Sequence, residues 1–278
     1  ILSGLVGSEM CIRDSVYFVE AKNFLSEYYT RMSIEEANNN NWSKVYTYQE
    51  NAIKVFPRKD TLYNRHAQTI LILANSVAAK KDLTEEDKTF VQSLIGQSIN
   101  VAKTASENVN PANVRNWETR ALIYKNVAQI AQNAADWSIA SYRLAIQLDP
   151  YNPRLRLDLG GVYYAKGDYL SAANEFRQAI SLKNDYANAY YNFAQALYQL
   201  QDFANAKAAL ETTKNLIGPN SEDAKLLDRE IEIVNQTLAA VNAKNSKPTV
   251  EQIQTKDTTT KTQQEPLTKV GDTTPTIT

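Results

Sequence analysis

The stretch from Pro153 to Pro219 contains two copies of one pattern, and this internal repeat constrains the fold more than any other feature of the chain. The first copy holds, in this order, Leu159, Gly160, Tyr163, Ala172 and Phe176. About 34 residues later, the second copy holds at the matching positions Phe193, Ala194, Leu197, Ala206 and Leu210. Each copy carries two apolar stripes with helical spacing, and one helical pair cannot bury all of that surface alone. The repeat therefore predicts helical hairpins that stack side by side.

The first helix of the first copy has clear boundaries. Asn152 precedes Pro153, which is typical of an N-cap followed by proline at the first helical position. Gly167-Asp168 then ends this helix and begins the turn into the next one. We interpret the repeated large and small residues as packing residues, because aromatic stripes at helical spacing are usually core.

This pattern resembles the tetratricopeptide (TPR) superfamily in its period and in the order of its large and small residues. The resemblance implies an all-α fold, a right-handed α-solenoid of helical hairpins. It also implies that the first helices of successive repeats line a concave groove, which binds an extended peptide or a partner helix.

Three less regular copies precede the clear repeat, between residues 16 and 152. The first has Trp42 at the start of its second helix, where the regular repeat has Tyr169. The second has Thr84 ahead of three acidic residues, which is an N-terminal capping signal. The third begins its pattern at Trp117 and carries an insertion near residues 129–137. We therefore expect about five repeats in residues 16–243, the first three of them degenerate.

Residues 221–243 predict one amphipathic helix that caps the solenoid. Its apolar stripe, which we expect to pack inward, comprises Leu227, Ile231, Val234 and Leu238. Its polar face, which we expect to meet water, comprises Glu222, Lys225, Arg229 and Glu230. Residues 244–278 are dominated by Thr, Gln, Lys, Asp and Pro, and they cannot bury enough apolar surface to offset the entropy of ordering. They predict a disordered tail.

The first residues need a separate interpretation. The helical pattern begins only at about Tyr17, and residues 4–15 resemble a translated sequencing-adapter remnant. We therefore expect residues 1–15 to be non-native or disordered, with a short, weakly structured N-terminus as the alternative. Since the chain starts at Ile1 and not at methionine, we expect it to be a fragment.

Composition argues against several classes of function. The chain has 278 residues and a formal net charge of −1, so we expect no large basic surface for nucleic acid. It has one cysteine, Cys11, and one histidine, His66, which argues against multi-cysteine and paired-histidine metal sites. We interpret His66 as a satisfied core histidine rather than a general base. The sequence offers no catalytic cluster, so we predict a non-enzyme without metal or cofactor.

The resemblance assigns candidate binding residues to the first helices of the two regular repeats. In the first repeat they are Arg154, Leu157, Gly161 and Tyr164. In the second repeat they are Asn188, Tyr191, Asn192, Gln195 and Tyr198. Tyrosine offers rigid aromatic contact area with a polar tip, and amide side chains can satisfy a peptide backbone. We therefore predict a scaffold that binds a protein or peptide partner; the alternative is that these positions are merely solvated.

One binding mode of the superfamily does not match these residues. Chaperone-binding TPR domains hold a terminal carboxylate with basic and Asn side chains from three repeats. Leu157 and Gly161 occupy the positions of the first pair, and Glu222 and Leu226 occupy those of the last pair. Only Asn192 matches, so we do not expect a chaperone-tail adaptor.

A narrower resemblance covers nearly all of residues 16–243. The order of units and the run from Pro150 to Gly160 are similar to the TPR region that follows the membrane domain of bacterial O-antigen-ligase/polymerase-like proteins. This resemblance implies a water-exposed domain in surface-polysaccharide assembly, tethered to the membrane through a missing upstream segment. It would place the chain outside the cytoplasm, whereas without that segment a cytoplasmic location is expected.

Overall fold

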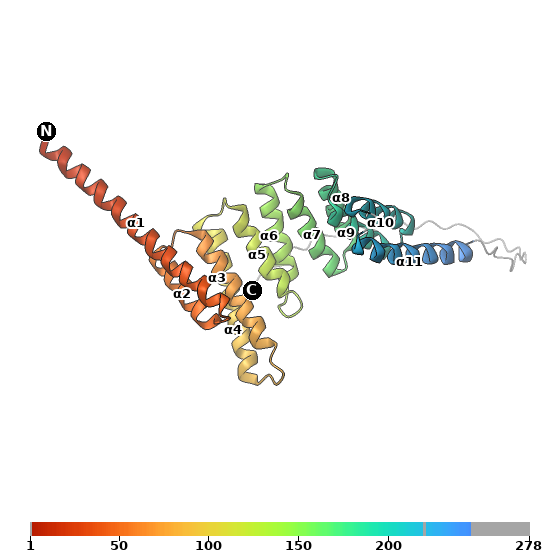
Figure 1. The fold of residues 1–278 in the computed structure, drawn as a ribbon, viewed down its shortest axis with the longest axis horizontal. Coiled ribbons are helices and arrows are strands. Elements are labelled where there is room, and N and C mark those ends of the chain that lie inside the picture. Colours follow the sequence, from red (N-terminus) through yellow and green to blue (C-terminus); the bar gives the residue numbers. More distant parts are fainter. Residues whose placement is uncertain (1, 219–220, 246–278) are drawn as a thin grey trace, which may run out of the picture. The chain divides into compact units, whose positions relative to one another are not determined.

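The computed structural model describes the backbone of residues 2–218 and 221–245, and the side chains of residues 16–218 and 221–243. Within these residues every regular element is a helix and no strand occurs. The elements (Figure 1) are α1 (Leu2–Asn38), α2 (Trp42–Val55), α3 (Asp60–Ala78), α4 (Glu85–Lys103), η1 (Thr104–Val109), α5 (Val114–Asn126), α6 (Ala134–Leu148), α7 (Pro153–Lys166), α8 (Tyr169–Leu182), α9 (Ala187–Gln199), α10 (Phe203–Ile217) and α11 (Glu222–Asn245). The predicted all-α solenoid is confirmed.

Each odd-numbered helix from α1 to α9 forms a hairpin with the helix that follows it. The hairpins are α1–α2, α3–α4, α5–α6, α7–α8 and α9–α10, and Figure 1 shows them following one another along the chain. Successive hairpins are joined because α2, α4, α6 and α8 each pack on the first helix of the next hairpin. The first helices α7 and α9 also contact each other directly. This contact brings the two predicted sets of binding residues together.

Helix α7 begins and ends where the sequence predicts. The Asn152 side chain accepts a hydrogen bond from the backbone N–H of Arg154 at 3.1 Å, and Pro153 stands in the first turn. Gly167 ends the helix in the left-handed region, with φ of 84°, where a residue without Cβ is favoured. Asp168 then caps α8 by accepting from the backbone N–H of Ser171 at 3.1 Å.

The repeated large residues are buried as expected, but they belong to more than one cluster. Tyr163 and Phe176 lie in the core between the third and fourth hairpins. Leu210 lies in a separate core that α11 completes with Leu227 and Val234. Phe193 of α9 packs against both cores. The interior of the solenoid is therefore a series of local cores, each shared by neighbouring elements.

A group of asparagines that the sequence did not predict ties α3 to α5. The Asp60 carboxylate accepts hydrogen bonds from the side-chain amides of Asn110, Asn113 and Asn116 at 3.0, 2.7 and 3.2 Å. The amide of Asn116 also donates to the backbone carbonyl of Ala105 in η1, a stretch of π-helix that prolongs α4. The wider π-turn and its long-range amide contacts have no local sequence signature.

The first helix extends further toward the N-terminus than the sequence predicts. Helix α1 begins at Leu2, whereas the pattern predicted a helix only from about Tyr17. Adding residues to an existing helix is inexpensive once the first turn has formed, so an apolar stripe is not needed at every turn.

Cys11 lies outside the described side chains, and the predicted tail lies almost wholly outside the described residues. Residues 240–278 separate from residues 1–239 as a second unit. In the described part of the chain, no helix combines the length and apolar character that a membrane crossing requires.

Candidate peptide-binding surface

The structure places all nine predicted binding residues on two neighbouring helices. Helix α7 carries Arg154, Leu157, Gly161 and Tyr164, and α9 carries Asn188, Tyr191, Asn192, Gln195 and Tyr198. All nine are at least partly exposed. We refer to them together as the α7/α9 surface.

The α7 half of this surface lies among charged side chains of α5 and α7. The Arg154 guanidinium donates to the Glu118 carboxylate on α5, and its Nε lies 3.7 Å from Asp158 Oδ2. Burial raises the pKa of Asp158, while the positive charges of Lys125 and Arg154 oppose that shift. A Cβ atom at Gly161 would lie 3.6 Å from Lys125 Nζ, so this ammonium group lies beside the glycine.

Helix α5 therefore contributes Glu118 and Lys125, which the sequence interpretation did not select. A signal for them was present, because the Trp117 pattern gives α5 the same register as α7 and α9. In that register Glu118 corresponds to Leu157, and Lys125 corresponds to Tyr164.

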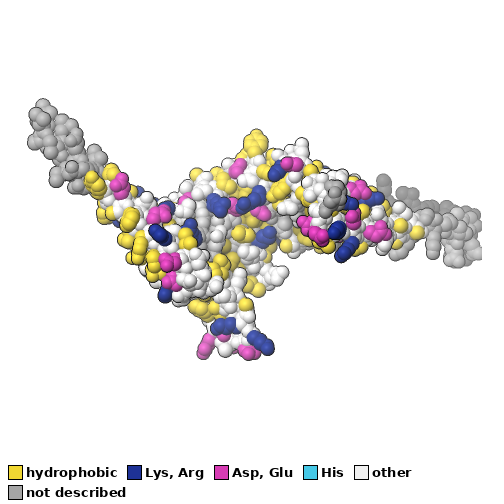
Figure 2. All heavy atoms as spheres, viewed as in Figure 1, with side chains coloured by type: hydrophobic (Ala, Val, Ile, Leu, Met, Phe, Trp, Pro, Cys, Tyr) yellow, Lys and Arg dark blue, Asp and Glu magenta, His cyan; other side chains and the backbone are white. Residues whose placement is uncertain are grey.

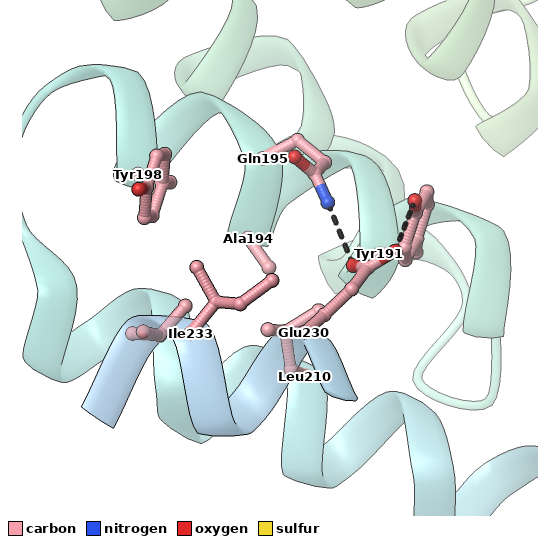
Figure 3. Close-up of a pocket in the computed structure, with 8 residues that line it drawn as sticks. Tyr191, Ala194, Gln195, Tyr198, Leu210, Glu230 and Ile233 are labelled. Atoms are coloured by element: carbon pink, nitrogen blue, oxygen red, sulfur yellow. Dashed lines mark hydrogen bonds between the residues drawn. The ribbon is translucent and has the colours of Figure 1, made fainter. Parts of the chain in front are cut away.

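The α9 half carries amides and a phenol, and it meets α11. Tyr191 Oη donates to Glu230 Oε1 at 3.1 Å, and Gln195 Nε2 donates to Glu230 Oε2 at 3.0 Å (Figure 3). Asn192 Nδ2 donates to the backbone carbonyl of Asn188 at 2.6 Å. The prediction that Glu230 faces water was wrong. Glu230 borders the apolar stripe of α11, and its side chain is long enough to reach the polar edge of α9.

Aromatic packing holds the tyrosines of the surface in place. Tyr164 meets Tyr169 edge to face, and Tyr198 meets Phe203 in the same way, each with ring centroids 5.2 Å apart. Burial raises the pKa of Tyr191, and the charge of Glu230 and the hydrogen bond to it add to that shift. Tyr191 is therefore a neutral hydrogen-bond donor at physiological pH. The surface presents aromatic side chains whose positions are set before any partner binds.

Two hollows lie where α9 meets α10 and α11. One of about 300 Å³ is lined by Tyr191, Gln195, Tyr198, Glu230 and Ile233, with small and aliphatic residues beneath them (Figure 3). The other, of about 240 Å³, shares Tyr191 and Glu230 and extends to Asn188, Asp223 and Leu226. The first volume lies at the lower limit of about 300 Å³ for pockets that hold a drug-sized ligand, and the second lies below it. Both hollows therefore suit a small group such as a single side chain.

His66 has the environment of a core residue. It is 4% exposed, its ring centroid lies 4.9 Å from that of Tyr46, and its Nδ1 lies 3.4 Å from Gln49 Oε1. Burial lowers the pKa of His66 to about 4, so the imidazole is neutral near pH 7. Among the described residues, no group of three His, Cys, Asp or Glu side chains could hold a metal ion.

The charged side chains are spread over the molecule in both signs. Figure 2 shows Lys and Arg side chains interspersed with Asp and Glu side chains on the face in view. The face that is visible therefore carries no large basic patch of the kind that nucleic acid requires.

Comparison with known proteins gives a family match and several similar folds. Residues 160–201 match the TPR repeat family. A thermophilic TPR protein from Thermus thermophilus is 16% identical with a TM-score of 0.51, and the match covers 75% of this chain and 99% of that one. MamA from Desulfovibrio magneticus RS-1, from residue 41 to its end, is 8% identical with a TM-score of 0.55, and the match covers 71% and 98% of the two chains. No curated protein sequence matches the chain.

The fold and the family match together define a TPR-type α-solenoid. They support the TPR superfamily and indicate no catalytic family. They do not show the narrower resemblance to O-antigen-ligase/polymerase-like proteins.

Proposed function

We propose that the chain is a protein-interaction scaffold, and that its α7/α9 surface binds an extended segment of a partner protein. The observation that carries this proposal is the pair of side-chain-sized hollows beside a row of partly exposed tyrosines and amides on α9.

The chemistry of the surface suits an extended peptide. Asn188 is exposed, and its side-chain amide can both donate to and accept from a peptide backbone. Tyr164 and Tyr198 supply contact area at little entropic cost, since their rings already pack against neighbours. The hollows would then accept alternate side chains of the bound segment.

Selection from a random-peptide display library on the immobilised chain tests this proposal. The selection should enrich peptides that bind the α7/α9 surface. When Asn188 and Asn192 are both replaced by Ala, the affinity of these peptides should fall at least about tenfold, which corresponds to about 1.4 kcal/mol. The control is Gln178→Ala, which removes an exposed amide from the second helix α8. Failure to enrich any peptide, or equal losses in both variants, would contradict the proposal.

A role as the water-exposed domain of a membrane-bound O-antigen-ligase/polymerase-like protein stays a prediction from the sequence resemblance. The coding sequence upstream of Val16 decides it. Long apolar spans there would support a membrane tether, and their absence would end this alternative.

A further inference from the structure

The larger of the two hollows, of about 300 Å³, is charged on one side only. Glu230 is its only charged lining residue, and none of the described residues that line it is basic. The neighbouring hollow adds a second carboxylate, Asp223, and again no basic residue. Within the described residues, the ion pairs of α11 are Lys214–Asp228 and Lys225–Glu222, and neither involves Glu230. The charge of Glu230 therefore has no cationic partner in the described part of the chain.

Two hydrogen bonds fix the Glu230 carboxylate and leave it half satisfied. Tyr191 donates to Oε1 and Gln195 donates to Oε2, one bond to each oxygen. An ionised carboxylate has about four acceptor positions, so about one remains on each oxygen. A guanidinium can fill two such positions with parallel N–H groups, and an ammonium can donate to either.

The other walls suit the stem of a basic side chain. Tyr191 and Tyr198 stand on the α9 side, and Ile233 stands on the α11 side (Figure 3). Long basic side chains pack their methylene groups on apolar surface, and their charged heads are attracted to tyrosine rings. A neutral apolar side chain would instead cover the remaining acceptors of Glu230 without providing a donor.

We propose that this hollow binds a lysine or arginine side chain of the partner segment, with Glu230 as its counter-ion. The proposal rests on the proposed function, because the hollow shares Tyr191, Gln195 and Tyr198 with the α7/α9 surface. It specifies a basic partner, which is the opposite of the carboxylate-terminated peptides that chaperone-binding TPR domains hold.

The test uses the full chain labelled with ¹³C at its tyrosine rings, and two probes of equal shape. Nα-acetyl-arginine amide carries the positive charge, and the corresponding citrulline amide does not. We expect the arginine probe to shift the Tyr191 and Tyr198 signals, with an affinity at least about fivefold above that of the citrulline probe. This difference should shrink as salt rises from about 0.05 M to about 0.5 M, since salt screens the ion pair.

Three variants on α11 assign the effect to Glu230. Glu230→Gln should reduce the affinity for the arginine probe to the affinity for the citrulline probe. The Gln amide keeps an acceptor for Tyr191, but it lacks the negative charge. Glu232→Gln, the same change at an exposed position of the same helix, should leave binding unchanged. Ile233→Lys places a cation three residues from Glu230 at a position that is 55% exposed, so it should block the probe while Glu230 is intact.

Equal binding of the two probes, absent shifts at both tyrosines, or full binding by a folded Glu230→Gln variant would overturn this inference. These outcomes remain distinct from failure of the proposed function. Library peptides that depend on Asn188 and Asn192 but require no basic residue would leave the scaffold role intact and remove only the basic-side-chain site.

Discussion

Gly160 and Gly96 both lie inside helices, but only Gly160 faces another helix at close range. A Cβ atom at Gly160 would lie 2.5 Å from a ring carbon of Phe176, whereas a Cβ atom at Gly96 would meet nothing within 4 Å. Gly160→Ala should therefore destabilise the fold by about 1–3 kcal/mol through overpacking. Gly96→Ala, the matched control, should stabilise it by up to about 1 kcal/mol, because alanine favours the helix. Urea unfolding of both variants measures the difference, and equal effects would contradict this account of α7–α8 packing.

The buried imidazole of His66 makes stability depend on pH. Its pKa lies at about 4 in the folded chain and near 6.5 in the unfolded chain, so the unfolded state binds the proton first as the pH falls. Stability is therefore retained above about pH 6.5 and declines toward pH 4. His66→Gln cannot take up this proton. The stability of the native protein relative to the variant should fall by about 3 kcal/mol between pH 7 and pH 4. A constant difference across that range would show that His66 titrates alike in both states.

Some single residues could be placed from the sequence, and others could not. The packing roles of Gly160 and Phe176 followed from helical spacing, because these two residues meet within one repeat. Glu230 was misplaced because its position depends on Tyr191 and Gln195, more than thirty residues away. The spacing of polar residues along one helix does not reveal which of them meets a donor on another helix.

At the scale of helices, α11 is a packed cap with one apolar face. Leu227 is 5% exposed and joins the core beneath α9 and α10, whereas the adjacent Leu226 is 54% exposed. Leu227→Ala should cost about 2–4 kcal/mol, since it removes buried methyl groups and leaves a cavity. Leu226→Ala should change stability by less than about 0.5 kcal/mol. Thermal or urea unfolding gives both values, and similar losses would mean that α11 packs on a different face.

Helix boundaries that carry a capping signal were predictable at this scale, because capping is local chemistry. Thr84 caps α4 by accepting from the backbone N–H of Asp87 at 3.1 Å, and Asp87 accepts in return from the Thr84 backbone at 3.2 Å. The contact between α3 and α5 was less predictable. It depends on Asp60 accepting from asparagines about fifty residues later, a contact that exists only after the second and third hairpins stack.

At the scale of the whole molecule, stacking of hairpins creates a surface that no single repeat contains. Helix α5 brings Lys125 beside α7, α7 brings Arg154 and Asp158, and α9 brings the amides and tyrosines. The resemblance to TPR proteins implied that the first helices of the repeats line the binding surface, and this stays a prediction. The sequence did not predict that α11 would place Glu230 at the edge of this surface, and that residue gives the surface its proposed preference for a basic partner.

Hydrogen exchange of the full chain, with and without a library-selected peptide, tests the central claim most directly. Binding at the α7/α9 surface should slow exchange in α7, α9 and the part of α11 around Glu230, and leave α8 and α10 little changed. Protection concentrated in α8 and α10, or spread equally over all five helices, would contradict the claim that the first helices of the repeats bind the partner.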